Sequence, residues 1–136
     1  MDSTTIEYDG QNHLLVNGDS RKYLKEIDNA SLIIGSPPYA NLRSYDSIEP
    51  KSYLDWFRGF GDGIKHALGE HGVFVLNIDS NIIKGARQIF PYEIVVYLVK
   101  EVDLLFIENI IWNKCKSLVM VGSKRPKGIY ENCFVF

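Results

Sequence analysis

Short apolar runs separated by glycine, asparagine and proline divide this chain into alternating strands and helices. Apolar runs of about four to eight residues bounded by turn residues are typical of buried strands, and repeats at helical spacing indicate helices. The pattern predicts strands at 13–17, 31–36, 73–79, 104–114 and 129–136, and helices at 20–27, 52–70 and 91–102. The segments 40–49, 80–90 and 115–128 are predicted loops.

The order of these elements predicts an α/β fold. Strands alternate with helices until the last two strands, which are joined by a loop, so we expect a doubly wound, mostly parallel sheet with an antiparallel strand near the C-terminus. The continuous apolar run at 31–36 is typical of a strand covered on both faces. Glycines at 59, 61 and 63 predict a weak or kinked middle for the second helix.

Composition indicates one ordinary globular domain over residues 1–136. Hydrophobic residues make up 46% of the chain and charged residues 24%. No apolar run approaches the roughly 18 residues that span a bilayer, and the polar, acidic start is not a signal peptide. We therefore expect a cytoplasmic protein without membrane contact.

Charge and cysteine content narrow the candidate chemistry. The formal net charge is −2, so any binding of nucleic acid must rest on a local basic patch. Cys115 and Cys133 lack metal-type spacing, which predicts reduced thiols and no metal site. Trp56 and Trp112 lie inside apolar elements and are predicted core residues.

The segment Ser36-Pro37-Pro38-Tyr39 begins at the last residue of the apolar run at 31–36. Each proline fixes φ and removes a backbone N–H, and each residue before a proline is pushed toward an extended conformation. The result is a stiff row of carbonyl and hydroxyl acceptors beside an aromatic ring. An exocyclic amine on a planar base would satisfy both features, but a rigid turn with a core tyrosine remains an alternative.

Two other strand ends are expected at the same edge of the sheet, where α/β folds bind ligands. Gly18 and Asp19 follow the first strand, and Asn77–Ser80 lie at the carboxyl end of the third. Asp19 could bind a ligand or act as N-cap of the helix that begins at Ser20. Asp79 and Ser80 could line the site or form a simple turn.

The Ser-Pro-Pro-Tyr segment and four further stretches, in order, resemble the DNA amino-methyltransferases. The further stretches are VNGDSRKYL (16–24), GVFVLNIDS (72–80), IIWNK (110–114) and RPKGIYENCFVF (125–136). Members of this family transfer a methyl group from S-adenosylmethionine to N4 of cytosine or N6 of adenine in DNA. The resemblance covers nearly the whole chain, which argues against an unrelated α/β binding domain.

The resemblance assigns roles to individual residues. It implies that Ser36, Pro37, Pro38 and Tyr39 form the catalytic loop and that Asp19 contacts the adenine amino group of the cofactor. A serine at the first position of the loop goes more often with cytosine N4, with adenine N6 as the alternative. The implied setting is DNA methylation within a restriction-modification system, on a base flipped out of the duplex.

Basic residues in two parts of the chain are candidates for DNA phosphate contacts. Arg43 follows the loop, and a basic, acid-free segment near the C-terminus contains Lys114, Lys116, Lys124, Arg125 and Lys127. A solvated loop without DNA contacts is the alternative for all of them.

The resemblance also indicates what the sequence lacks. The family holds the methionine part of the cofactor on a Gly-rich loop between a strand and a helix, and no such loop occurs in residues 1–136. One permuted branch places its catalytic half first, and the target-recognition region and the Gly-rich half afterwards. We therefore expect the N-terminal catalytic half of a methyltransferase, which pairs with a complementing chain or with itself through exposed sheet edges, including the last strand. A non-catalytic remnant is the alternative.

Overall fold

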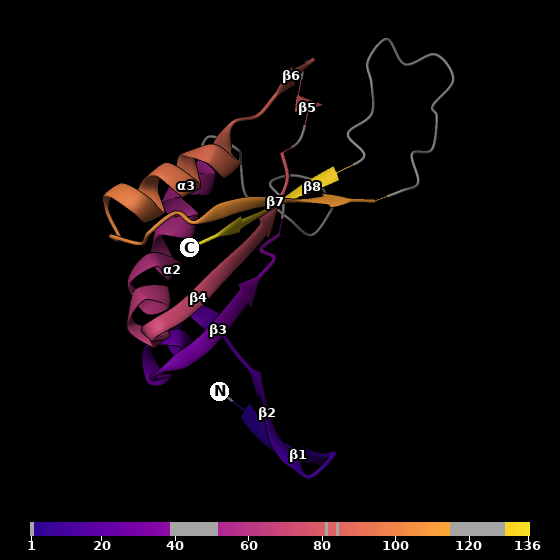
Figure 1. Cartoon of the computed structure of the whole chain (residues 1–136), viewed down its shortest axis with the longest axis vertical. Coiled ribbons are helices and arrows are strands. Elements are labelled where there is room, and N and C mark those ends of the chain that lie inside the picture. The colour runs from indigo at the N-terminus through magenta and orange to yellow at the C-terminus, as the bar shows by residue number, and fades with distance from the viewer. Residues whose placement is uncertain (1, 39–51, 81, 84, 115–129) are drawn as a thin grey trace.

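The computed structural model describes residues 2–38, 52–80, 82–83, 85–114 and 130–136. Four of the strands form one sheet in the order β3-β4-β8-β7 (Figure 1). These strands are β3 (Ala30–Gly35), β4 (Leu68–Ile78), β7 (Glu108–Asn113) and β8 (Tyr130–Val135). β3 and β4 are parallel, whereas β8 is antiparallel to both β4 and β7. The fold is therefore α/β with a mixed sheet, and β8 is the antiparallel strand expected near the C-terminus.

The helices α2 (Tyr53–Ala67) and α3 (Phe90–Lys100) pack against the same face of the sheet. Both agree with the predicted helices. Their apolar side chains form one core with alternate residues of β4 and with the end of β8, and this core includes Phe57, Ile64, Phe74, Leu76, Ile78, Ile94, Leu98 and Phe134. The short helix α1 (Ser20–Tyr23) and the 3-10 turn Leu24–Glu26 pack against α2.

The opposite face of the sheet carries exposed apolar side chains. Leu32 and Ile34 of β3 are 55% and 68% exposed. The prediction that this strand is covered on both faces is therefore wrong for the described residues. Trp112 of β7, which the apolar pattern placed in the core, is 53% exposed. Trp56 packs against the core as predicted.

The predicted strand at 13–17 exists as β2 (Gln11–Asn17), but it pairs with β1 (Asp2–Tyr8) in a separate two-stranded sheet. This hairpin projects away from the rest of the molecule (Figure 1). The pattern missed β1 because its residues are mostly polar. Asp9 and Gly10, with φ of 50° and 71°, form the two-residue turn. An Asp-Gly pair of this kind is a strong hairpin signal.

The last strand does not form an edge of the described sheet, contrary to the expectation that it would be an exposed edge. β8 lies between β4 and β7, and its Phe134 is 2% exposed. In the described part of the sheet the free edges belong to β3 and β7. No helix among the described residues is long and apolar enough to cross a membrane.

Glycines allow α2 to approach its neighbours closely, and the helix is uninterrupted despite them. A Cβ added at Gly61 would lie 2.1 Å from the Tyr97 hydroxyl oxygen of α3. A Cβ at Gly63 would lie 2.9 Å from the Cβ of Leu24. The low helix propensity of these glycines is thus offset by close packing against neighbouring elements, which a larger residue would prevent.

The remaining elements are short. The predicted loop at 80–90 contains the two-residue strands β5 (Ile82–Ile83) and β6 (Ala86–Arg87), which pair with each other. The predicted loop segments at 40–49 and 115–128 lie outside the described residues.

Candidate active site

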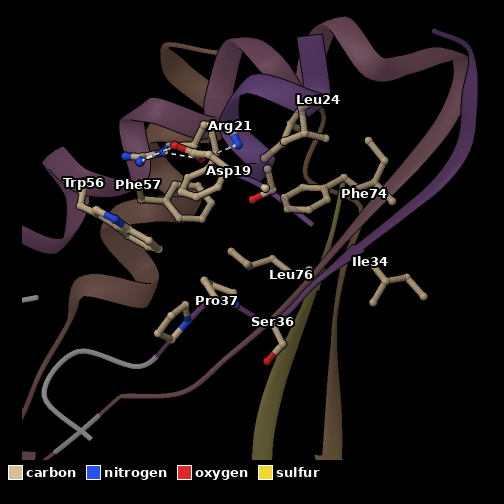
Figure 2. Close-up of a pocket in the computed structure, with 17 residues that line it drawn as sticks. Asp19, Arg21, Leu24, Ile34, Ser36, Pro37, Trp56, Phe57, Phe74 and Leu76 are labelled. Atoms are coloured by element: carbon tan, nitrogen blue, oxygen red, sulfur yellow. Dashed lines mark hydrogen bonds and ion pairs between the residues drawn. The ribbon is translucent and has the colours of Figure 1, made fainter. Parts of the chain in front are cut away.

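The strand β3 delivers the Ser-Pro-Pro segment to the carboxyl edge of the sheet. Its last residue, Gly35, pairs with Leu76 of the parallel strand β4, and Ser36 follows directly. Figure 2 shows Pro37 near Leu76, while the Ser36 hydroxyl points away from the apolar side chains of the neighbouring cavity. Ser36, Pro37 and Pro38 all line this cavity.

A cavity of about 520 Å³ lies between β3, α1 and α2 (Figure 2). Its volume falls in the usual range for sites that bind small organic ligands. Three segments that are distant in the sequence line it: residues 18–21, residues 33–38 and the aromatic side chains Trp56, Phe57 and Phe60 of α2. The structure thus brings Asp19 and the Ser-Pro-Pro segment together at one cavity.

Asp19 is held by Arg21 at the mouth of this cavity. Its Oδ1 accepts hydrogen bonds from the Arg21 backbone N–H at 3.0 Å and from Nε at 2.9 Å, and Oδ2 accepts from Nη2 at 2.7 Å. The hydrogen bonds from the Arg21 side chain lower the pKa of Asp19 to about 2. Asp19 is therefore ionised at neutral pH. The backbone contact is an N-cap of α1, which is the alternative role left open by the sequence.

Tyr53 anchors the end of the Ser-Pro-Pro segment. Its hydroxyl donates a hydrogen bond to the Pro38 carbonyl oxygen at 2.5 Å. The Tyr53 ring is fully buried, and its centroid lies 4.5 Å from that of Phe90 and 5.2 Å from that of Trp56. The Pro38 carbonyl, for which the sequence predicts no partner in a local turn, is thus bound by a side chain of α2. No pattern in the sequence pointed to Tyr53, because a tyrosine in the first turn of an apolar helix is an ordinary core residue.

Asn77 of β4 contacts the other side of the segment. The Ser36 hydroxyl donates to Asn77 Oδ1 at 3.3 Å. The Asn77 amide nitrogen lies 3.3 Å from the Asn132 carbonyl oxygen and 3.4 Å from Cys133 Sγ. The sequence placed Asn77 at a strand end but did not identify it as a partner of Ser36.

Asp79 and Ser80, next along the chain after β4, form a turn that Arg87 closes. The Asp79 Oδ1 accepts from the Ser80 backbone N–H at 2.7 Å and from Arg87 Nη1 at 3.2 Å, and Arg87 also reaches Ser80 Oγ at 3.0 Å. These contacts support the turn alternative for the pair.

Tyr39 lies outside the described residues. So do most of the predicted DNA contacts, namely Arg43, Lys116, Lys124, Arg125 and Lys127. Lys114 is described, and its ammonium group forms an ion pair with Glu131 and lies 6.0 Å from the centre of the Trp112 ring. Among the described residues, no group of three or more His, Cys, Asp or Glu side chains is arranged to hold a metal ion.

Comparison with known proteins gives one consistent result. A family model described as DNA methylase matches residues 30–136. The type II methyltransferase M.PvuII of Proteus hauseri is 30% identical in an alignment of 111 residues that covers 77% of this chain and 33% of that protein.

Solved structures show the same fold. The PvuII DNA methyltransferase, described as cytosine-N4-specific, superimposes with a TM-score of 0.73 and 25% identity over 87% of this chain and 46% of that chain. A DNA modification methylase of Thermus thermophilus, complexed with S-adenosyl-L-methionine, gives a TM-score of 0.66 at 21% identity, over 87% of this chain and 52% of that chain.

This chain therefore spans about a third of the curated relative and about half of the solved structures. The family model covers most of the chain, including the Ser-Pro-Pro segment and all four strands of the main sheet. The chain belongs to the DNA methylase family.

Proposed function

We propose that this chain carries the catalytic half of an S-adenosylmethionine-dependent DNA methyltransferase that modifies N4 of cytosine. The observation that carries the proposal is the Ser36-Pro37-Pro38 segment at the carboxyl end of β3, beside a cavity that Asp19 also lines. The similarity to a methyltransferase described as cytosine-N4-specific supports the choice of base. N6 of adenine is the alternative target.

The segment suits an exocyclic amine because it offers fixed acceptors. The lone pair of such a nitrogen is delocalised into the base, which makes it a poor nucleophile. Hydrogen bonds from its N–H groups to the Ser36 hydroxyl oxygen and the Pro37 carbonyl would favour a pyramidal nitrogen and orient its lone pair. The gain is one of orientation and electrostatics. Tyr39 would stack on a base that has left the duplex.

The cavity fits the adenine side of S-adenosylmethionine, which supplies a methyl group activated on a sulfonium. Trp56, Phe57 and Phe60 provide an apolar wall for a planar ring. Asp19 is held ionised, so its carboxylate can accept a hydrogen bond from an amino group in exchange for one of those that Arg21 donates to its two oxygens. The sequence contains no Gly-rich strand–turn–helix, so we expect another segment to hold the methionine part.

A segment from elsewhere would complete the fold. Within the described residues β3 pairs only with β4, so its outer edge presents unpaired backbone groups. The exposed side chains Leu32 and Ile34 lie on the same strand. We expect the Gly-rich half to pair with this edge and to cover the open face with helices, which would make the sheet doubly wound. Self-association through this edge is the alternative.

Identification of the methylated base in the DNA product tests the proposed function. The chain is joined to, or co-expressed with, a segment that contains the Gly-rich strand–turn–helix, and the DNA is digested to nucleosides after reaction with S-adenosylmethionine. Mass spectrometry is expected to detect N4-methylcytosine. N6-methyladenine would correct the target base, and the absence of any methylated base would contradict the proposal.

The isolated chain is expected to bind S-adenosylmethionine weakly or not at all, because it supplies only the adenine side of the site. Titration calorimetry with the 136-residue chain measures this directly. Tight stoichiometric binding would show that these residues suffice, and would contradict the division of the cofactor site between two segments.

Neutralising Lys124, Arg125 and Lys127 together is expected to weaken DNA binding and to reduce its salt dependence. Removal of one phosphate interaction lowers the slope of log K against log salt by about 0.9, so removal of three corresponds to roughly 3. A triple change at Lys22, Lys25 and Lys100, which are exposed on other elements, serves as the control. An unchanged slope in the first variant would assign its residues to a solvated loop.

A further inference from the structure

Asn77 lies directly beside Ser36 at the carboxyl edge of the sheet. Because Gly35 pairs with Leu76 in the parallel register, the next residues of β3 and β4 are neighbours on the face that the helices do not cover. On its other side Asn77 pairs with Cys133 of β8. The side chain is half-buried and spans the space between these strands.

The hydrogen-bond partners fix the direction of the Asn77 amide. Its nitrogen lies 3.3 Å from the Asn132 carbonyl oxygen, which can only accept, so the NH₂ group must point toward β8. The amide oxygen then faces Ser36, at 3.3 Å from Oγ. An amide oxygen has no hydrogen to give, so the hydrogen in this contact belongs to the Ser36 hydroxyl.

This polarity matters for the proposed reaction. A hydroxyl has one hydrogen and two lone pairs. When the hydrogen is donated to Asn77, Ser36 presents only lone pairs to an incoming ligand. An exocyclic amine needs such an acceptor for its N–H, whereas a hydroxyl free to rotate could donate its hydrogen to the amine nitrogen and occupy the electrons needed for attack.

We infer that Asn77 is a positioning residue that fixes the Ser36 hydroxyl as a hydrogen-bond acceptor for the target amine. The inference rests on the proposed function, and it adds a residue that acts through Ser36 without touching the base. Asn77 itself is oriented by the Asn132 carbonyl and more weakly by Cys133 Sγ. The Asn132 carbonyl of β8 thus fixes the Asn77 amide, and the Asn77 amide oxygen in turn fixes the direction of the Ser36 hydroxyl.

A double-mutant cycle in the assembled enzyme tests this inference. Asn77→Leu has nearly the same size and removes both the acceptor and the donor. It is expected to lower kcat about tenfold, with KM for DNA nearly unchanged, because the interaction that it removes orients the reacting amine. In the Ser36→Ala background the same change is expected to cost less than about twofold, because Asn77 then has no hydroxyl to orient.

Two further variants separate positioning from structural support. Asn77→Asp keeps an oxygen that accepts from Ser36, so it should retain more activity than Asn77→Leu. Asn109→Leu removes an amide on β7 that donates to the Asn132 side-chain oxygen at 3.0 Å, on the side of β8 away from Ser36. This variant should leave kcat unchanged. Tm is measured for every variant.

The outcomes are distinct. Normal kcat in Asn77→Leu, or effects that add fully in the double variant, would overturn the inference. Asn77→Leu could instead lose activity together with Tm, and Asn109→Leu could show the same losses. That result would mean that Asn77 only stabilises the sheet, and it would also overturn the inference. If Ser36→Ala itself keeps full activity, the proposed function of the segment fails instead.

Discussion

Ser36→Ala is expected to cut methyl transfer tenfold or more while leaving the fold intact. The change removes one acceptor aimed at the target amine, a loss of about 1–3 kcal/mol, and about 1.4 kcal/mol corresponds to tenfold in rate. The side chain is exposed at the end of β3, so little packing is removed. Single-turnover methylation and Tm are measured on the same preparation of the assembled enzyme.

Ser31→Ala is the matched control for this prediction. Ser31 is an exposed serine on the same strand, near the opposite end from the catalytic segment. It should keep full activity. Normal turnover in Ser36→Ala would leave the segment as a rigid turn and would remove the catalytic interpretation.

Tyr39→Ala is expected to weaken both capture of the flipped base and turnover. Stacking of a base on an aromatic side chain contributes roughly 1–3 kcal/mol, so its removal should raise KM for DNA as well as lower kcat. If Tyr39 were instead a core residue, the variant would lose Tm in proportion to activity. Measurement of Tm beside both kinetic constants distinguishes the two roles.

Gly61→Ala is expected to destabilise the chain, although alanine is the better helix former. The added Cβ would lie 2.1 Å from the Tyr97 hydroxyl oxygen and 2.8 Å from Val102 Cγ2. Tyr97 is held in place, because its hydroxyl donates to the Arg58 carbonyl at 3.2 Å and the Arg58 guanidinium lies 4.7 Å from its ring centre. Overpacking typically costs about 1–3 kcal/mol, which outweighs a helix-propensity gain of about 1 kcal/mol.

Gly59→Ala, in the same helix, is expected to stabilise the chain. The three atoms nearest to its added Cβ all belong to the Arg21 side chain, with Cδ at 3.0 Å, and this side chain is exposed and can shift by a few tenths of an ångström. The gain in helix propensity should then dominate, and the free energy of unfolding should rise slightly. Urea denaturation of both variants measures the difference. A stability of Gly61→Ala equal to that of Gly59→Ala would contradict the close packing of α2 on α3.

Much of the fold follows from local pattern. The apolar pattern located α2, α3 and the strands of the main sheet within about five residues. Among these elements α2, α3, β4 and β8 bury one side in a common core, whereas the side chains of β7 are mostly exposed. The pattern could not show that β3 has an open face. A continuous run such as residues 31–36 predicts two covered faces, but the described residues supply helices on only one.

The candidate site was predictable where a residue type is unusual for its position. A Pro-Pro pair after an apolar strand suggested a ligand site, and the family resemblance added Asp19; the structure brings them to one cavity. Tyr53 and Asn77 were not predictable as partners of the segment. Their roles arise from the register of β3 on β4 and from the approach of α2, which are tertiary features that local spacing does not encode.

Methyl transfer by the reassembled enzyme tests the central claim most directly. Transfer of labelled methyl groups from S-adenosylmethionine to DNA is measured for this chain, for a segment carrying the Gly-rich strand–turn–helix, for the two together, and for the pair with Ser36→Ala. We expect transfer only when both segments are present, and a loss of at least about tenfold with Ser36→Ala. Full transfer by either segment alone, or by the pair regardless of Ser36, would contradict the assignment of this chain as the catalytic half.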